Sequence, residues 1–149
     1  MRSTKINIWL ILDGKRGHEK QSEDLAQALQ NIVDIEITKI EGIFFKPLIS
    51  KFLRLFNFDS NKKPDLIIGT GHSTHLSMIF SKIVNGGKTI VIMKPSLPHS
   101  WFDLCLIPKH DGISEKPGIF LTNGAINNIE NENKHNKSKG LIAVSYTHL

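Results

Sequence analysis

The first stretch that could carry chemistry is a short polar loop near the start of the chain. It separates an apolar run from a helical pattern and reads Asp13-Gly14-Lys15-Arg16-Gly17-His18. Its glycines permit a tight turn and close backbone approach to a ligand, and the following helix offers free N–H groups to an anion. The spacing is not that of a phosphate-binding P-loop. A ligand-binding loop and an ordinary glycine turn with solvated basic residues are both compatible with this pattern.

A second polar loop lies in the same kind of position and reads Gly69-Thr70-Gly71-His72-Ser73-Thr74-His75. Its hydroxyl and imidazole groups can hold a hydroxylated or phosphorylated ligand through short hydrogen bonds. His72 and His75 could instead bind a metal, but no carboxylate or cysteine lies near them in the sequence. Ser73 or Thr74 could simply cap the next helix. We favour ligand binding over a metal, and we expect this loop to lie outside the core.

Three further polar loops follow apolar runs: Met93–Pro98, Pro108–Gly112 and Asn123–Ala125. His110 could act as a base or a donor toward a ligand, whereas Asp111-Gly112 is also typical of an ordinary turn. His110 and Asp111 are not expected to form a catalytic dyad through adjacency alone, because neighbouring side chains of an extended chain point apart.

The segments between these loops alternate between strand and helix patterns. Runs typical of strands, most of them buried on both faces, are Ile6–Leu12, Ile32–Ile40, Asp65–Gly69, Thr89–Met93, Leu104–Pro108 and Ile119–Thr122. Helical patterns occupy Glu19–Gln30, Phe44–Phe56 and Thr74–Val84, the last with Leu76, Ile79, Phe80 and Ile83 facing inward.

This alternation predicts an α/β fold with a doubly wound, mostly parallel sheet and helices on both of its faces. Right-handed crossovers then place every strand-to-helix loop at one edge of the sheet. All five polar loops follow strands, whereas random polar turns would fall at both edges. We therefore expect the five loops to share the carboxyl edge of the sheet, where ligands bind.

Composition narrows the function classes. Hydrophobic residues make up 40% and charged residues 22% of the 149 residues, which is typical of one globular domain. No membrane span or secretory signal is predicted, so we expect a cytoplasmic protein. The single cysteine, Cys105, excludes an internal disulfide and the usual zinc clusters. The formal charge is +5, but no RNA-binding or zinc-finger motif is present, so we predict no nucleic-acid partner.

The predicted helix Phe44–Phe56 combines a wide apolar stripe with Lys46, Lys51 and Arg54 between its members. This pattern is typical of helices that rest on an anionic membrane surface. An ordinary core-facing helix with solvated lysines is the alternative. Peripheral membrane attachment through this helix is therefore a hypothesis.

The motif Trp9-Leu10-Ile11-Leu12-Asp13-Gly14-Lys15-x-Gly17-His18-x-x-Gln21-Ser22 resembles the opening of the mitochondrial-fission "elongated mitochondria" family, which has many bacterial members. The resemblance continues through Asp65-Leu66-Ile67-Ile68-Gly69-x-Gly71-x-x-Thr74-His75, Phe102-Asp103-Leu104, Pro108-x-His110-Asp111 and Leu121-Thr122-x-Gly124-Ala125. It thus covers residues 6–126 in the family's order. One departure is Lys94-Pro95, where the family more often has an acidic residue, which argues against a carboxylate role at that loop.

The resemblance implies one half of a glycosyltransferase with two Rossmann-like domains, of the GT-B-like kind. This half would hold the acceptor, the other half would bind the nucleotide-sugar donor, and no cofactor is implied. Candidates for the catalytic base are His18, His75 and His110. Candidate ligand-binding residues are Asp13, Gly14, Lys15, Gly17, Gly69, Gly71, Thr74, Asp111, Asn123 and Gly124. The alternative function is a non-enzymatic adaptor, because plant members are associated with recruiting a dynamin-like protein.

The end of the chain has a different character. We expect a Rossmann-like domain over residues 1–126, a linker over 127–139 and the first strand of a missing C-terminal domain over 140–143. Residues 144–149 match the translation of a common sequencing adapter and are interpreted as a non-native tail. We therefore expect this chain alone to be inactive as a transferase and to bind nucleotide sugars weakly or not at all.

Overall fold

The structure is a computed structural model that describes residues 5–42 and 63–127 of the chain. The predicted helix Phe44–Phe56 and the expected linker and tail lie outside the described residues. The strands are β1 (Ile6–Leu12), β2 (Ile35–Glu41), β3 (Leu66–Thr70), β4 (Lys88–Ile92), β5 (Leu104–Pro108) and β6 (Ile119–Thr122). The helices are α1 (Arg16–Gln30) and α3 (His75–Asn85), with short 3-10 turns η2 (His72–Thr74), η3 (His99–Trp101) and η4 (Lys109–Asp111).

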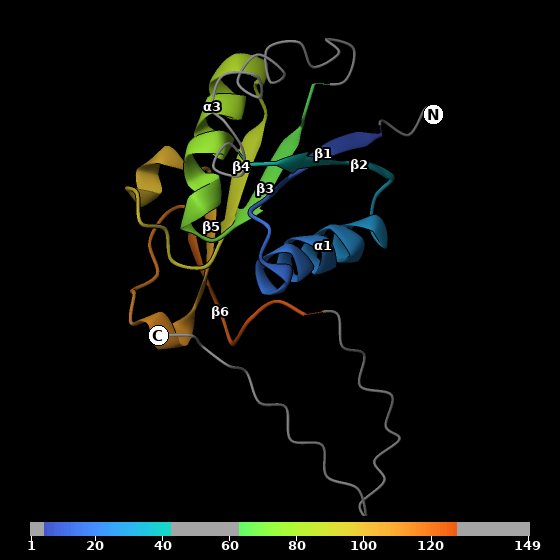
Figure 1. The fold of residues 1–149 in the computed structure, drawn as a ribbon. Helices are drawn as coiled ribbons and strands as arrows, with labels where there is room; N and C mark the ends of the chain where they lie inside the picture. Colours follow the sequence, from blue (N-terminus) through green and yellow to red (C-terminus); the bar gives the residue numbers. More distant parts are fainter. Residues whose placement is uncertain (1–4, 43–62, 128–149) are drawn as a thin grey trace, which may run out of the picture.

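The six strands form one sheet in the order β2-β1-β3-β4-β5-β6, and every neighbouring pair is parallel (Figure 1). The predicted α/β class with a doubly wound, Rossmann-like sheet is therefore confirmed. Because β2 and β3 lie on opposite sides of β1, the order of the strands reverses between β1 and β3. Ligands of such sheets bind at this reversal, beyond the carboxyl ends of the strands.

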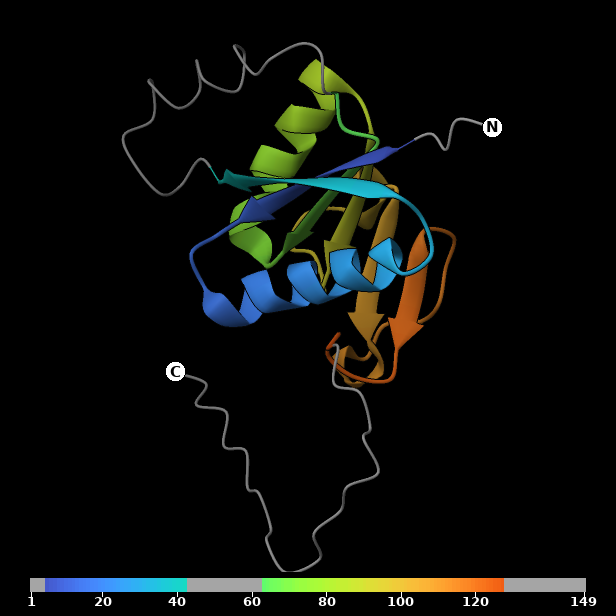
Figure 2. The same ribbon diagram turned by 90° about the vertical axis from the view of Figure 1, so that its right-hand side faces the viewer.

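The two described helices cover opposite faces of the sheet (Figure 1, Figure 2). On one face, Ala26 of α1 packs against Ile8 and Leu10 of β1. On the other face, Met78 of α3 packs in one cluster with Trp9 of β1. Successive residues of β1 thus face different helices, because side chains alternate across a strand. This burial on both faces is why β1 reads as an almost continuous apolar run.

The largest difference between predicted and observed strands is at β2, which begins at Ile35 rather than Ile32. The backbone N–H groups of Ile32 and Val33 both donate to the carbonyl oxygen of Leu29, so these apolar residues close the end of α1. The apolar type of both residues favours a strand, but the local hydrogen bonds of the helix terminus prevail. Helix α1 also begins at Arg16, three residues before the predicted start at Glu19.

The predicted inward face of α3 is wrong at two of its four positions. Leu76 is 50% exposed and Ile83 is 75% exposed, whereas the buried residues of this helix are His75, Ser77, Met78 and Ser81. The reason is a close approach between α3 and β3 at Gly69. A Cβ atom at Gly69 would lie 2.5 Å from the sulfur of Met78. The helix therefore packs through its small and polar face, which a hydrophobicity pattern does not identify.

Among the described residues, no helix is long and apolar enough to cross a bilayer. The predicted membrane attachment through Phe44–Phe56 stays a prediction, since that segment lies outside the description.

Candidate functional site

The loops that follow β1 and β3 meet where the strand order reverses, and Asp13 lies at their centre. This residue directly follows β1 and is only 5% exposed. Its Oδ2 accepts a hydrogen bond from Ser73 Oγ at 2.9 Å and lies 2.7 Å from His18 Nδ1, while its Oδ1 accepts from the backbone N–H of Lys15 at 3.0 Å. The chain thus brings two predicted site residues, Asp13 and His18, into direct contact.

Asp13 carries its charge at neutral pH despite its burial. Burial alone raises the pKa of a carboxyl group, because it disfavours the charged form. Here the hydrogen bonds from His18, the Lys15 N–H group and Ser73 outweigh burial and hold the pKa of Asp13 below its ordinary value of 3.8. A charged carboxylate against His18 Nδ1 fixes the proton of the imidazole on Nδ1.

His18 is placed to act as a base. It lies in the first turn of α1, its side chain is 20% exposed, and its Nε2 has no hydrogen-bond partner among the described residues. With Nδ1 donating to Asp13, Nε2 is left with a free lone pair on a side chain that is partly exposed. A carboxylate that orients an imidazole in this way is the arrangement found in bases that accept a proton from a hydroxyl group.

Gly71 makes the contact between Asp13 and His18 sterically feasible. Its φ is +83°, and a Cβ atom there would lie 2.5 Å from His18 Nδ1 and 3.4 Å from Asp13 Oδ2. The sequence named Gly71 as a candidate ligand-binding residue. The structure instead places the ring of His18 in the space that a side chain at position 71 would occupy.

The backbone N–H groups of the first loop are partly taken by carboxylates of the chain itself. The N–H group of Gly14 donates to Glu19 Oε1 at 3.0 Å, and that of Lys15 donates to Asp13. Glu19 is a site contact that the sequence analysis missed, although its position one turn into α1 is a usual one for an acidic residue that satisfies such groups. This loop consequently offers fewer free donors to an anion than its glycines predicted.

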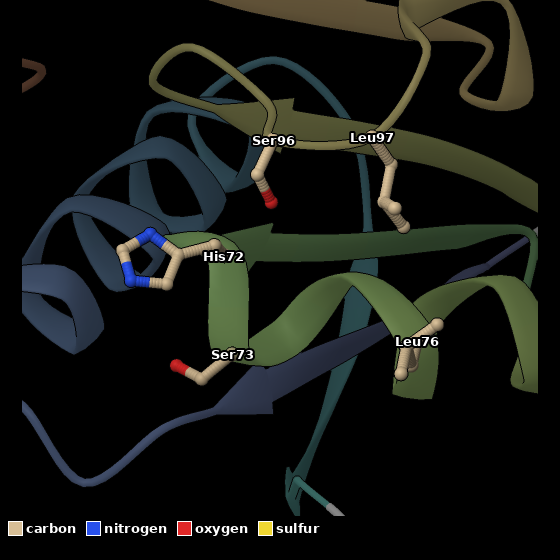
Figure 3. Close-up of a pocket in the computed structure, with 5 residues that line it drawn as sticks. All are labelled: His72, Ser73, Leu76, Ser96 and Leu97. Atoms are coloured by element: carbon tan, nitrogen blue, oxygen red, sulfur yellow. The ribbon is translucent and has the colours of Figure 1, made fainter.

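A pocket of about 350 Å³ opens beside this centre, between the start of α3 and the loop after β4 (Figure 3). Its lining residues are His72, Ser73, Leu76, Ser96 and Leu97. Figure 3 shows Ser96 and Leu97 on the loop after β4, across from Leu76 on α3. Because Ser73 also donates to Asp13, one residue belongs both to the pocket and to the Asp13–His18 centre.

His75 lies in the protein interior, in contact with Ser96 of this pocket, which corrects the expectation that its loop lies outside the core. Its side chain is 1% exposed and stacks at a tilt on Phe102, with 5.2 Å between the ring centres. Nδ1 lies 3.3 Å from Ser96 Oγ, and Nε2 is buried with no hydrogen-bond partner among the residues that the structure describes. Burial, with a smaller contribution from the charge of His72, lowers the pKa of His75 to about 4. The imidazole is therefore neutral at physiological pH.

Two other predicted residues of the β3 loop hold the turn together. Thr74 is fully buried, and its hydroxyl donates to the carbonyl oxygen of Gly71 at 2.7 Å. Neither Ser73 nor Thr74 caps α3 in the way that we considered, because the residue at the N-cap position, Thr74, makes no side-chain cap bond. Gly69 serves the packing of α3 on β3. Gly17 has open space around its Cβ position, so the structure gives no reason for a glycine there.

The remaining candidates lie at the same edge of the sheet but at a distance from this centre. His110 and Asp111 follow β5, and Asn123 and Gly124 follow β6. With strands about 4.8 Å apart, β5 is roughly 14 Å from β1. His110 Nε2 lies 3.6 Å from Asp111 Oδ1, in contrast to our expectation that these neighbours point apart. The reason is that both belong to the 3-10 turn η4 and not to extended chain.

Within residues 5–42 and 63–127, no group of three or more histidine, cysteine or acidic side chains is arranged to hold a metal ion. The chemistry that the described residues support is proton transfer to and from a bound hydroxyl group, by His18 with Asp13.

Comparison with known proteins agrees with the resemblance of the motifs. The family model described as Mitochondrial fission ELM1 matches residues 16–144. A protein of Rickettsia prowazekii (strain Madrid E), named "Uncharacterized protein RP120", is 30% identical over 115 residues, which cover 71% of this chain. The chain spans only 32% of the length of that relative. No solved structure matches. Since the family model matches most of the chain, the protein belongs to the mitochondrial fission ELM1 family.

Proposed function

We propose that this domain is the acceptor-binding half of a glycosyltransferase, in which His18 removes the proton of an acceptor hydroxyl group. The observation that carries the proposal is the contact between the buried carboxylate of Asp13 and His18 Nδ1, 2.7 Å long, where the strand order reverses. A base at this place lies where ligands of doubly wound sheets bind. An ion pair that only stabilises the fold would not have to lie at the ligand-binding edge of the sheet.

In the proposed reaction, the O–H bond of the acceptor breaks and its proton passes to His18 Nε2. The oxygen forms a bond to the anomeric carbon of the donor sugar, and the nucleoside diphosphate leaves with the electron pair of the broken bond. Asp13 stabilises the resulting imidazolium through the Nδ1 hydrogen bond, as in other carboxylate–histidine pairs. The donor would be bound by the part of a longer protein that this chain lacks, since the chain spans 32% of its Rickettsia relative.

The surroundings of the three predicted bases support His18 as the base. His75 is buried, and its pKa of about 4 makes it a poor proton acceptor near neutral pH. His110 is largely exposed on η4, and its only described acidic partner is the neighbouring Asp111 at 3.6 Å. His18 alone among the three has a buried carboxylate on one ring nitrogen, while its other ring nitrogen has no hydrogen-bond partner among the described residues.

The test is a substitution in a long form of the protein, one that has the full length of the Rickettsia relative. Transfer or hydrolysis is measured with a panel of nucleotide sugars for the wild type, His18→Gln and the control His110→Gln. We expect kcat to fall about 10²- to 10⁴-fold in His18→Gln, which is the usual contribution of a general base, and to stay within threefold in His110→Gln. Equal turnover in wild type and His18→Gln would exclude the proposed base.

The same measurement distinguishes the adaptor function from the enzyme. An adaptor needs no turnover, so a long form that binds no nucleotide sugar and releases no nucleoside diphosphate would favour it over the enzyme. Calorimetric titration of the 149-residue chain gives the complementary control. Low-micromolar affinity of this chain alone for a nucleotide sugar would contradict the assignment of donor binding to another domain.

A further inference from the structure

The pocket beside Asp13 and His18 has the dimensions and lining of a small-molecule site. Its volume of about 350 Å³ falls within the range of ligand pockets in proteins. Leu76 and Leu97 form apolar walls, and the hydroxyl groups of Ser73 and Ser96 supply polar contacts. Leu76 is half exposed at the very start of α3, so a ligand in the pocket would cover a leucine that the fold leaves open to water.

The pocket and the base are directly connected. Ser73 lines the pocket and donates to Asp13 Oδ2, and the same oxygen atom contacts His18 Nδ1. A ligand whose one end fills the pocket can therefore present its other end to His18. This places the reacting hydroxyl group at one end of the ligand and the part in contact with Leu76 and Leu97 at the other.

The charges of the site disfavour an anionic ligand at both ends. At the base, the carboxylate of Asp13 is negative, and the N–H groups of Gly14 and Lys15 already donate to carboxylates. In the pocket, no lysine or arginine is among the lining residues, and His72 is the one lining side chain that can carry a charge. The cations nearest in sequence, Lys15, Arg16 and Lys94, are all exposed. A phosphate group would thus find no lysine or arginine partner in the pocket, and it would meet repulsion from Asp13 beside it.

The polar wall of the pocket suits a neutral hydroxylated molecule. Ser96 is exposed to the pocket, and its Oγ lies 3.3 Å from Nδ1 of the buried His75. Because a hydroxyl group can make three hydrogen bonds, Ser96 keeps bonding capacity for a ligand after this contact. His75 is held neutral by burial, so this partner of Ser96 adds no charge next to the pocket.

We infer that the acceptor is a neutral hydroxylated molecule with an apolar portion, bound with that portion between Leu76 and Leu97 and with a hydroxyl group directed at His18. This assignment rests on the proposed function for the identity of the ligand as an acceptor. The pocket itself, and its selectivity for neutral amphiphilic molecules, do not depend on whether His18 acts as a base.

The experiment measures binding of three probes to the 149-residue chain by titration followed with NMR. Hexyl β-D-glucoside has both a hydroxylated and an apolar part, methyl β-D-glucoside lacks the apolar part, and hexyl phosphate replaces the neutral part by an anion. We expect hexyl glucoside to bind at least tenfold more tightly than either of the others, with shifts at Leu76 and Leu97. Equal affinity for the two glucosides, or tighter binding of hexyl phosphate, would overturn the inference.

Matched variants test whether hexyl glucoside binds in the pocket. Leu76→Gln and Leu97→Gln should each weaken hexyl glucoside at least tenfold, because both place a polar group against the alkyl chain. Ile83→Gln is the control, since Ile83 is also an exposed aliphatic residue of α3 but does not line the pocket. A loss in Ile83→Gln as large as that in Leu76→Gln would show non-specific adsorption and contradict the pocket.

The two proposals fail in different ways. If hexyl glucoside binds as expected while His18→Gln of the long form keeps full turnover, the pocket stands and the base is wrong. If His18→Gln loses turnover but hexyl glucoside and methyl glucoside bind equally, the base stands and the acceptor class is wrong.

Discussion

Two aspartates at opposite edges of the sheet both accept several hydrogen bonds, but the two carboxylates serve different purposes. Asp13 lies at the carboxyl edge, in contact with His18, Ser73 and one loop N–H group. Asp103 lies just before β5 at the amino edge, and two lysines and the backbone and side chain of Thr89 all donate to it. Burial raises the pKa of both carboxyl groups, but in each case the hydrogen bonds outweigh it and the pKa lies below its ordinary value.

The partners distinguish the two carboxylates. The partners of Asp103 are the ammonium groups of Lys82 and Lys88 and the N–H group of Thr89 in β4. Asp103 thus connects two strands with α3, and none of these partners keeps an atom that could react. The partners of Asp13 are a histidine and a serine, which can change protonation state or rotate toward a ligand. A buried carboxylate indicates a functional site only when its partners retain an unused reactive atom, and His18 Nε2 is such an atom.

The largest expected effect concerns stability at the amino edge. Asp103→Ala should lower the free energy of unfolding by about 3 kcal/mol, because the buried N–H group of Thr89 and the ammonium group of Lys82 lose their acceptor. Asp13→Ala should cost about half as much, since His18 and Ser73 can turn to water. Urea unfolding of the two variants at pH 7 gives both values. A larger loss in Asp13→Ala would mean that the carboxyl-edge cluster is primarily structural.

The sequence predicted the fold well because the strands are buried and short. The observed bounds of β1, β5 and β6 match the predicted Ile6–Leu12, Leu104–Pro108 and Ile119–Thr122. Each is a largely apolar run that ends at, or is directly followed by, a polar or turn-forming residue, and such signals are local. The inward face of α3 was mispredicted because it depends on Gly69, a residue of another element.

The second prediction concerns the pH dependence of stability, in which His75 differs from both aspartates. Folding lowers the pKa of His75 from 6.5 to about 4, so the unfolded chain binds the proton more tightly than the folded one. The stability that this difference contributes is complete above pH 6.5 and is lost as the pH falls toward 4. The linkage relation gives a loss of about 2 kcal/mol by pH 5. Both aspartates stay charged in this window, and their contributions decline only below about pH 4.

Unfolding by urea at a series of pH values between 7.5 and 4.5 measures this slope. His75→Leu should flatten it, because the variant has no group that must give up a proton on folding. The Asp13→Ala and Asp103→Ala variants are the controls, and both should keep the slope. An unchanged slope in His75→Leu would assign the acid sensitivity to another histidine.

The composition of the site could be predicted only in part. Asp13 and His18 stand in one loop, so their proximity is a local property that the sequence showed. Their hydrogen bond depends on Gly71, which comes from a different strand and leaves room for the imidazole ring. Two of the five loops, those after β1 and β3, form the centre, and two others, those after β5 and β6, lie at a distance from it. This division depends on strand order, which periodicity does not determine.

The third prediction uses two glycines with nearly the same backbone. Gly71 has φ +83° and Gly86, at the end of α3, has φ +82°, but only Gly71 has another side chain in its Cβ position. Gly86→Ala should therefore cost about 1–3 kcal/mol for its backbone conformation alone, because essentially only glycine adopts this combination of φ and ψ. Gly71→Ala should cost about 1 kcal/mol more, because the ring of His18 must move.

The ring nitrogen signals of His18 in a ¹⁵N NMR spectrum decide whether that ring has moved. The Nδ1 signal should lose the signature of a proton bonded to a carboxylate in Gly71→Ala and keep it in Gly86→Ala. Equal stability losses with unchanged His18 signals would show that Gly71 does not secure the Asp13–His18 contact.

The smallest expected effects lie in the two lysines of the amino edge, and they test whether Asp103 is held by its surface partner. Lys88 is 73% exposed and lies 3.2 Å from Asp103, whereas the side chain of Lys82 is more buried and its distance is 2.7 Å. Exposed ion pairs contribute little because water screens them and ordering a long side chain costs entropy. Lys88→Met should therefore change the free energy of unfolding by less than about 0.5 kcal/mol, and Lys82→Met should lower it by about 1 kcal/mol. Urea unfolding at low and high salt checks both values, because only the Lys88 contribution should disappear in 1 M salt. A loss in Lys88→Met that matches Lys82→Met at high salt would mean that both lysines are needed to satisfy Asp103. The amino edge would then resemble a network of three charges more than a partly buried carboxylate with one firm cation.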